Sequence, residues 1–182
     1  KKIHNPGRGR VTLDVLEHSS IPADILLLPD RPKINAMDWS TIVFPTDFSD
    51  TSQSTIRRIA PIFKNERPRL LILFAYKMPV TYFPYLKIND AVENKKEGLK
   101  NEIRSFVDVE LADLNEKFST KLLATKNKSV SRAIEDYMEE YASALIVISK
   151  TGKGQIEKAF LGSVAAELIR SSLDKAMWIS AS

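Results

Sequence analysis

One stretch of the chain, residues 144–172, restricts the possible folds more than any other. It begins with a continuous apolar run of strand length, Ala144 to Ile148, which is typical of a strand buried on both faces. The chain then becomes small and polar, and Gly162-Ser163 opens a helix with apolar periodicity. A strand, loop and helix start of this kind form anion sites in α/β proteins, because backbone N–H groups and the helix dipole can point at one anion where no side chain intervenes.

The rest of the chain repeats this alternation of strands and helices. We expect four further strands in the main domain, at 40–44, 70–75, 122–124 and 176–179. We expect helices capped by Ser49 or Asp50, along an apolar stripe from Leu99 to Phe118, from Ser129, and after Gly162. The order βαβαβαβαβ predicts an α/β fold, a doubly wound, mostly parallel five-stranded sheet with helices on both faces, because parallel strands need right-handed crossovers.

Two polar stretches directly follow strands of this predicted sheet. Thr46-Asp47 comes after the strand at 40–44, and Ser149 to Gly154 comes after the strand at 144–148. In such sheets ligands bind beyond the carboxyl ends of the strands, where the strand order reverses. We therefore expect both stretches to face one crevice. The plainer alternatives are that Asp47 caps a turn or helix and that Ser163 only satisfies the N–H groups of a helix start.

The first thirty residues resemble a second copy of the end of the chain. They contain a helical spacing at Val11, Val15 and Leu16, the triplet Ser19-Ser20-Ile21 and an aliphatic strand signal at 25–28. The same order of features follows Gly162. We infer that residues 1–34 are the last helix and strand of an upstream repeat, and that residues 38–182 form one full domain. An unrelated N-terminal arm is the alternative.

Composition excludes several functional classes. The 182 residues contain no Cys, which excludes disulfides, thiolate metal sites and Cys nucleophiles. His4 and His18 lie in the N-terminal segment without a cluster of further ligands, so we expect neither a metal site nor a His-based hydrolase. The net charge of +4 is modest and scattered, so we expect no nucleic-acid partner. No apolar run or leader suggests a membrane partner, and we expect a cytoplasmic protein.

Two motifs make residues 40–181 resemble the universal stress protein family. The first is Pro45-Thr46-Asp47-Phe48-Ser49. The second is the family's nucleotide loop, Gly-x-x-Gly-x9-Gly-[Ser/Thr], onto which Gly152, Gly162 and Ser163 fall in register. Ser149 stands where that loop has its first Gly.

The resemblance implies an adenine nucleotide alpha hydrolase-like fold that binds ATP or AMP, with or without Mg²⁺, in a stress-response or signalling module that is not an enzyme. It implies that Asp47 contacts the nucleoside, that the backbone of Ala75 lies near the base, and that Gly152, Gly162 and Ser163 hold phosphate. The side chain of Ser149 either crowds the ligand or donates its hydroxyl to a phosphate. A dimerising scaffold that holds no nucleotide and an ATP-using enzyme on a related fold are the alternatives.

The resemblance also implies self-association, because members of the family associate through their last strands as homodimers or tandem pairs. It places Ile25 to Leu28 antiparallel beside Ala176 to Ile179, with Trp178 at the junction. This pairing would use an edge of the sheet that would otherwise be exposed.

Overall fold

The computed structural model describes residues 12–16, 23–29, 40–66, 68–77, 88–112, 118–125, 128–141, 144–151, 161–171 and 175–181, without the side chains of residues 63–66 and 88–92. Residues 12–16 are helical. The strands are β1 (Ile25–Leu27), β2 (Thr41–Pro45), β3 (Arg69–Tyr76), β4 (Phe118–Ala124), β5 (Leu145–Ser149) and β6 (Met177–Ser180). The helices with defined bounds are α2 (Asp50–Glu66), α3 (Ile88–Glu110), α4 (Val130–Met138) and α5 (Ser163–Ser171).

The six strands form one sheet in the order β1-β6-β5-β2-β3-β4. Strands β2 to β6 are the five parallel strands that the sequence predicts. Strand β1 adds a sixth, antiparallel to β6, with Leu26 opposite Trp178. The predicted position of the N-terminal strand and of Trp178 is therefore confirmed. The strand order reverses at β2, which lies between β5 and β3.

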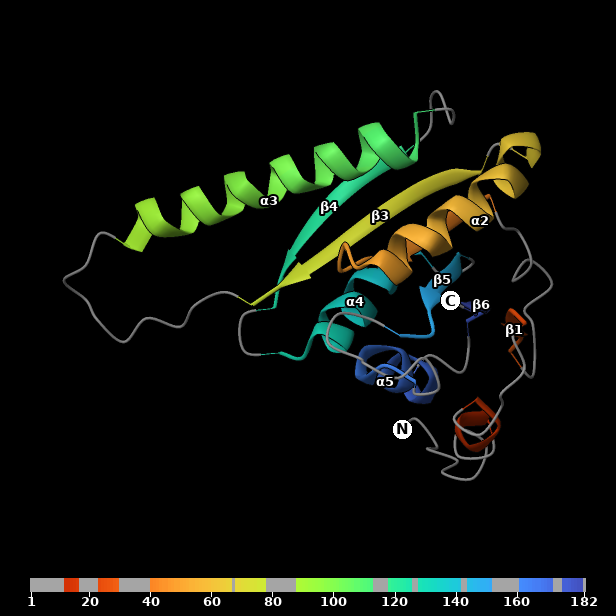
Figure 1. Cartoon of the computed structure of the whole chain (residues 1–182). Helices are drawn as coiled ribbons and strands as arrows, with labels where there is room; N and C mark the ends of the chain where they lie inside the picture. Colours follow the sequence, from red (N-terminus) through yellow and green to blue (C-terminus); the bar gives the residue numbers. More distant parts are fainter. Residues whose placement is uncertain are drawn as a thin grey trace.

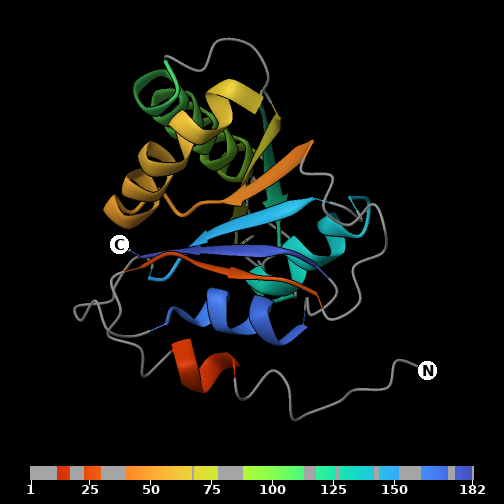
Figure 2. The same ribbon diagram turned by 90° about the vertical axis from the view of Figure 1, so that its right-hand side faces the viewer.

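Two helical layers cover the sheet (Figures 1 and 2). Helices α2 and α3 lie on one face, and α4, α5 and residues 12–16 lie on the other. Alternation along the strands divides the core accordingly, because successive strand side chains point to opposite faces. In β5, Ile146 and Ile148 pack on the α4/α5 side, whereas Leu145 and Val147 pack on the α2/α3 side.

Two apolar residues lie elsewhere than the sequence pattern predicts. In the helical residues 12–16, Leu13 and Leu16 face the core, and Val15 is 58% exposed. The helical spacing at Val15 and Leu16 does not by itself identify the buried face, because Leu13 and Leu16 also share one helical face. Helix α3 ends at Glu110, and Phe118 begins β4 instead of continuing the helix. Strand β4 is therefore longer than the predicted 122–124 and pairs with β3 from Phe118 onward.

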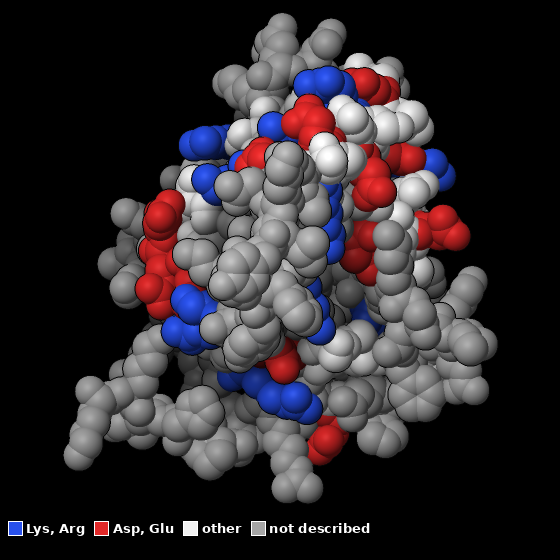
Figure 3. Space-filling model, turned by 90° about the vertical axis from the view of Figure 1, so that its left-hand side faces the viewer, with Lys and Arg blue, Asp and Glu red and all other residues white. Residues whose placement is uncertain are grey.

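No described helix is long and apolar enough to cross a membrane. On the face shown in Figure 3, acidic and basic side chains are both present among the described residues.

Candidate functional site

A cavity of about 250 Å³ opens at the carboxyl ends of β2, β3 and β5, beside the point where the strand order reverses. Side chains from the sheet, from α2 and from α4 and α5 line it. The described lining residues are Pro45, Thr46, Asp47, Ser52, Leu73, Ala75, Val130, Ile134, Ile148, Ser149, Thr151, Gly162, Ser163, Val164 and Ala165. The cavity therefore joins the two polar stretches that the sequence places in one crevice.

Six of the seven predicted site residues line this cavity: Thr46, Asp47, Ala75, Ser149, Gly162 and Ser163. The seventh, Gly152, lies outside the described residues. The sequence reasoning did not identify Val130 and Ile134 of α4 or Ser52 of α2, all of which also line the cavity. Periodicity showed that Val130 and Ile134 share an apolar face, but not that part of this face borders a cavity.

The backbone conformation of Phe48 determines the course of the loop that carries Asp47. Its φ of 58° lies in the left-handed region, which costs a non-glycine residue about 1–2 kcal/mol. Its ring stacks on Phe74, with centroids 4.6 Å apart, and lies 5.4 Å from the ring of Phe106. The Phe48 N–H donates to the hydroxyl of Thr46 at 3.0 Å. The ring stacking on the α2/α3 side thus stabilises the strained backbone of Phe48. In this backbone conformation the neighbouring Asp47 lines the cavity.

The carboxylate of Asp47 is fixed by hydroxyl and amide donors at the start of α2. Its Oδ1 accepts from the Ser49 N–H at 3.1 Å, the Ser49 hydroxyl at 2.6 Å and the Ser52 hydroxyl at 2.8 Å. Ser49 also caps α2, since its Oγ accepts from the Ser52 N–H at 3.3 Å. Asp47 therefore organises the helix start and lines the cavity at the same time.

The side chain of Ser149 points toward α2. Since Ile148 packs on the α4/α5 side, strand alternation turns the next side chain to the opposite face. There the hydroxyl of buried Thr55 donates to Ser149 Oγ at 3.2 Å. A cavity remains beside Ser149 although a side chain stands where the family loop has glycine.

The N-terminus of α5 forms the wall of the cavity opposite the start of α2. Ser163, Val164 and Ala165 supply the first turn of this helix and all line the cavity. The N–H groups of a first helical turn have no partner within the helix, and the helix dipole is positive at this end. Just before the helix, the Gly162 N–H donates to the Lys150 carbonyl at 2.8 Å, which joins the helix start to the end of β5.

Two acidic side chains lie between α4 and α5, outside the described lining of the cavity. The Ser171 hydroxyl donates to Glu135, and the Ser131 hydroxyl donates to Glu167. The Glu135 side chain is 15% exposed and pairs with Arg132 at 3.2 Å. Burial raises the pKa of Glu135, and the nearby carboxylates add to this rise while Arg132 opposes it.

We expect the raised pKa of Glu135 to reduce stability as the pH rises. The folded state holds the Glu135 proton more tightly than the unfolded chain, so stability falls as the pH rises from the ordinary glutamate value of 4.5 through the raised pKa. Glu135→Gln should remove this loss, so the melting temperature of this variant, relative to that of the unmodified protein, should rise as the pH is raised above about 4.5. An equal gain in Glu139→Gln, at an exposed residue, would contradict the assignment to Glu135.

The fold and the cavity define a class of protein: a doubly wound α/β domain that presents a carboxylate and a helix N-terminus to one pocket at the reversal of strand order. The profile of the universal stress protein family matches residues 39–173. The chain belongs to the universal stress protein family. No curated protein matches the chain in sequence.

Solved structures share this fold at low sequence identity. Universal stress protein UspA from Lactobacillus plantarum is 19% identical, with a TM-score of 0.58 over 72% of this chain and 90% of that chain. A universal stress protein from Archaeoglobus fulgidus DSM 4304 is 15% identical, with a TM-score of 0.60 over 93% of this chain and 53% of that chain. A universal stress protein solved in complex with cAMP is 23% identical, with a TM-score of 0.56 over 78% of this chain and 97% of that chain.

Proposed function

We propose that the cavity binds an adenine nucleotide, ATP or AMP, and that the chain acts as a nucleotide-responsive stress or signalling module. One observation carries the proposal: Asp47 and the first turn of α5 line the same cavity. A carboxylate accepts hydrogen bonds from sugar hydroxyls, and a helix N-terminus favours phosphate. A nucleotide has both groups within one small molecule.

The rest of the lining supports the same ligand class. Leu73, Ala75, Val130, Ile134 and Ile148 form an apolar wall beside the polar groups, which suits a flat aromatic base. Drug-sized ligands occupy pockets of about 300–1,000 Å³, so a cavity of about 250 Å³ favours AMP over ATP as the better fit. The related protein solved with cAMP supports a nucleotide as the ligand.

The charge of the cavity suggests how phosphate would be held. The described lining residues include neither Lys nor Arg, so backbone N–H groups and the α5 dipole would carry phosphate recognition. No group of three or more metal-ligating side chains comes together among the described residues. Any Mg²⁺ would therefore bind mainly through the phosphates of ATP.

We propose binding and not catalysis as the role of this site. The described lining contains hydroxyls and one carboxylate but no His, Lys or Cys that would activate a nucleophile. A cytoplasmic location stays a prediction from the sequence.

We also propose that residues 1–34 are the last helix and strand of an upstream repeat. The antiparallel pairing of β1 with β6 supports this, because it joins two equivalent last strands of the sheet. The Archaeoglobus fulgidus protein supports it too, since its alignment covers 93% of this chain but only 53% of its own length. On this account the β1/β6 junction is the interface of a tandem pair, and β1 occupies the edge through which a homodimer would otherwise associate.

Calorimetric titration of the purified chain with AMP and ATP tests the nucleotide proposal. We expect AMP to bind with a dissociation constant below about 1 mM, and inorganic phosphate alone to bind more weakly because it makes none of the base and sugar contacts. If neither AMP nor ATP binds below that limit, the proposal is wrong.

A further inference from the structure

The carboxylate of Asp24 holds the end of strand β6. Asp24 directly precedes β1, and its side chain is 21% exposed. Its Oδ1 accepts from the Ala181 N–H at 2.8 Å and from the hydroxyl of fully buried Ser180 at 3.3 Å. Arg58 of α2 pairs with the same oxygen at 3.1 Å and also donates to the Ala181 carbonyl. One carboxylate thus joins the N-terminal strand, the last strand and α2.

The peptide group that Asp24 holds is hydrogen-bonded in turn to the loop beside the cavity. The Ala181 N–H and the Ser180 carbonyl belong to the same peptide unit, and this carbonyl accepts from the Lys150 N–H at 3.1 Å. The Lys150 carbonyl then accepts from the Gly162 N–H at 2.8 Å. Gly162 lines the cavity and directly precedes α5.

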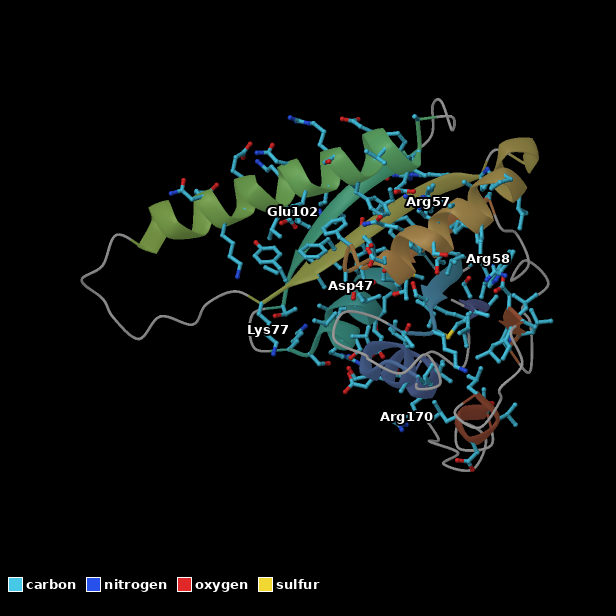
Figure 4. All side chains as sticks on the ribbon, viewed as in Figure 1. Asp47, Arg57, Arg58, Lys77, Glu102 and Arg170 are labelled. Carbon is cyan, nitrogen blue, oxygen red and sulfur yellow. The ribbon has the colours of Figure 1, made fainter. Side chains whose placement is uncertain are left out.

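We propose that Asp24, which does not itself line the cavity among the described residues, is a positioning residue for the phosphate end of the site. Its carboxylate holds the Ser180–Ala181 peptide, and the carbonyl of this peptide holds the Lys150 N–H. The Lys150 carbonyl in turn holds the Gly162 N–H at the start of α5. The inference rests on the proposed nucleotide site. Figure 4 shows Asp47 at the start of α2 and Arg58 further along the same helix, on the side of β1.

The physical reason is that hydrogen bonds in series reinforce one another. A charged acceptor polarises the peptide that it holds, and a polarised carbonyl accepts more strongly from the next N–H. Loss of the Asp24 carboxylate should therefore weaken the hydrogen bonds of the Lys150 and Gly162 N–H groups. The part of the cavity lined by Asp47 should stay in place. We therefore expect the affinity for the phosphate group to fall and the affinity for the nucleoside to change little.

Hydrogen exchange in the ligand-free protein tests the positioning without any nucleotide. In Asp24→Ala we expect the Lys150 and Gly162 amides to exchange about tenfold faster. The Thr46 amide, which donates to the Leu73 carbonyl at 2.9 Å at the same end of the sheet, should exchange as before. In Asp24→Asn the amide oxygen still accepts but carries no charge, so exchange at Lys150 and Gly162 should lie between that of the unmodified protein and that of Asp24→Ala. Unchanged exchange at Lys150 and Gly162 in Asp24→Ala overturns the inference.

A comparison of AMP with adenosine tests the consequence for binding. We expect Asp24→Ala to weaken AMP binding about five- to tenfold and adenosine binding less than about twofold, with the AMP affinity of Asp24→Asn between those of Asp24→Ala and the unmodified protein. Glu97→Ala, which removes an exposed carboxylate of α3, is the control and should change neither affinity.

The outcomes separate the inference from the proposed function. If the unmodified protein binds AMP but Asp24→Ala weakens AMP and adenosine equally, or weakens neither, only the positioning role of Asp24 is overturned. If the unmodified protein binds neither ligand, the proposed function fails and the inference that rests on it fails as well.

Discussion

Replacing Asp47 with asparagine is expected to weaken AMP binding between about 10-fold and about 100-fold, because hydrogen bonds to a charged acceptor contribute about 1.5–3 kcal/mol. Asparagine keeps a side-chain oxygen that can accept from Ser49 and Ser52, so the start of α2 should stay intact. The variant should therefore separate ligand binding from folding. Calorimetric titration measures the first, and thermal unfolding measures the second.

Ser52→Ala provides the matched control for Asp47→Asn. It removes one donor to the Asp47 carboxylate but leaves the charge and the two contacts from Ser49. We expect AMP affinity to change less than about threefold in this variant. If Asp47→Asn binds AMP as well as the unmodified protein does, the carboxylate is no part of the binding site and only its helix-capping role remains.

Filling the cavity is the second change with a large expected effect. Val130 lies at the first position of α4 and lines the cavity on the side opposite the α2/α3 layer. In Val130→Trp the indole should occupy much of the roughly 250 Å³ available, so AMP affinity should fall by more than about 100-fold. A partly exposed position at the cavity edge tolerates the larger side chain better than the core does.

Arg132→Trp places the same side chain two residues along α4. The Arg132 side chain is 57% exposed and does not line the cavity among the described residues. This variant should bind AMP like the unmodified protein. Equal AMP affinity in both tryptophan variants would mean that the nucleotide binds outside the cavity.

Local sequence patterns were enough to predict most of the fold. The apolar run before Ser149, the Gly162-Ser163 helix start and the helix cap at Ser49 each depend on a few neighbouring residues. The pairing of β1 with β6 required one more step, the recognition that the chain repeats its own ending. Where two periodic patterns fit a helix equally well, local patterns did not show which residue is buried. Leu13, which is buried, and Val15, which is exposed, are the example.

The geometry of the site depended on contacts between residues far apart in the sequence. The direction of the Ser149 side chain follows from strand alternation, but its hydroxyl partner, Thr55, comes from another element. The left-handed backbone of Phe48 depends on stacking with Phe74 and Phe106, which no local pattern around Asp47 reveals. Most of the polar residues that line the cavity could therefore be predicted from the sequence, whereas the shape of the cavity is set by tertiary packing.

The most direct test of the central claim is an AMP titration followed by amide NMR on the isotope-labelled chain. The account predicts that the amides of Thr46, Ser149 and Ser163 to Ala165 shift together and saturate at one dissociation constant, because these residues line one cavity. Amides of the exposed half of α3, such as Glu97, should not shift. Saturable shifts that leave the Ser163 to Ala165 amides unmoved, or no shifts up to about 1 mM AMP, would contradict the account.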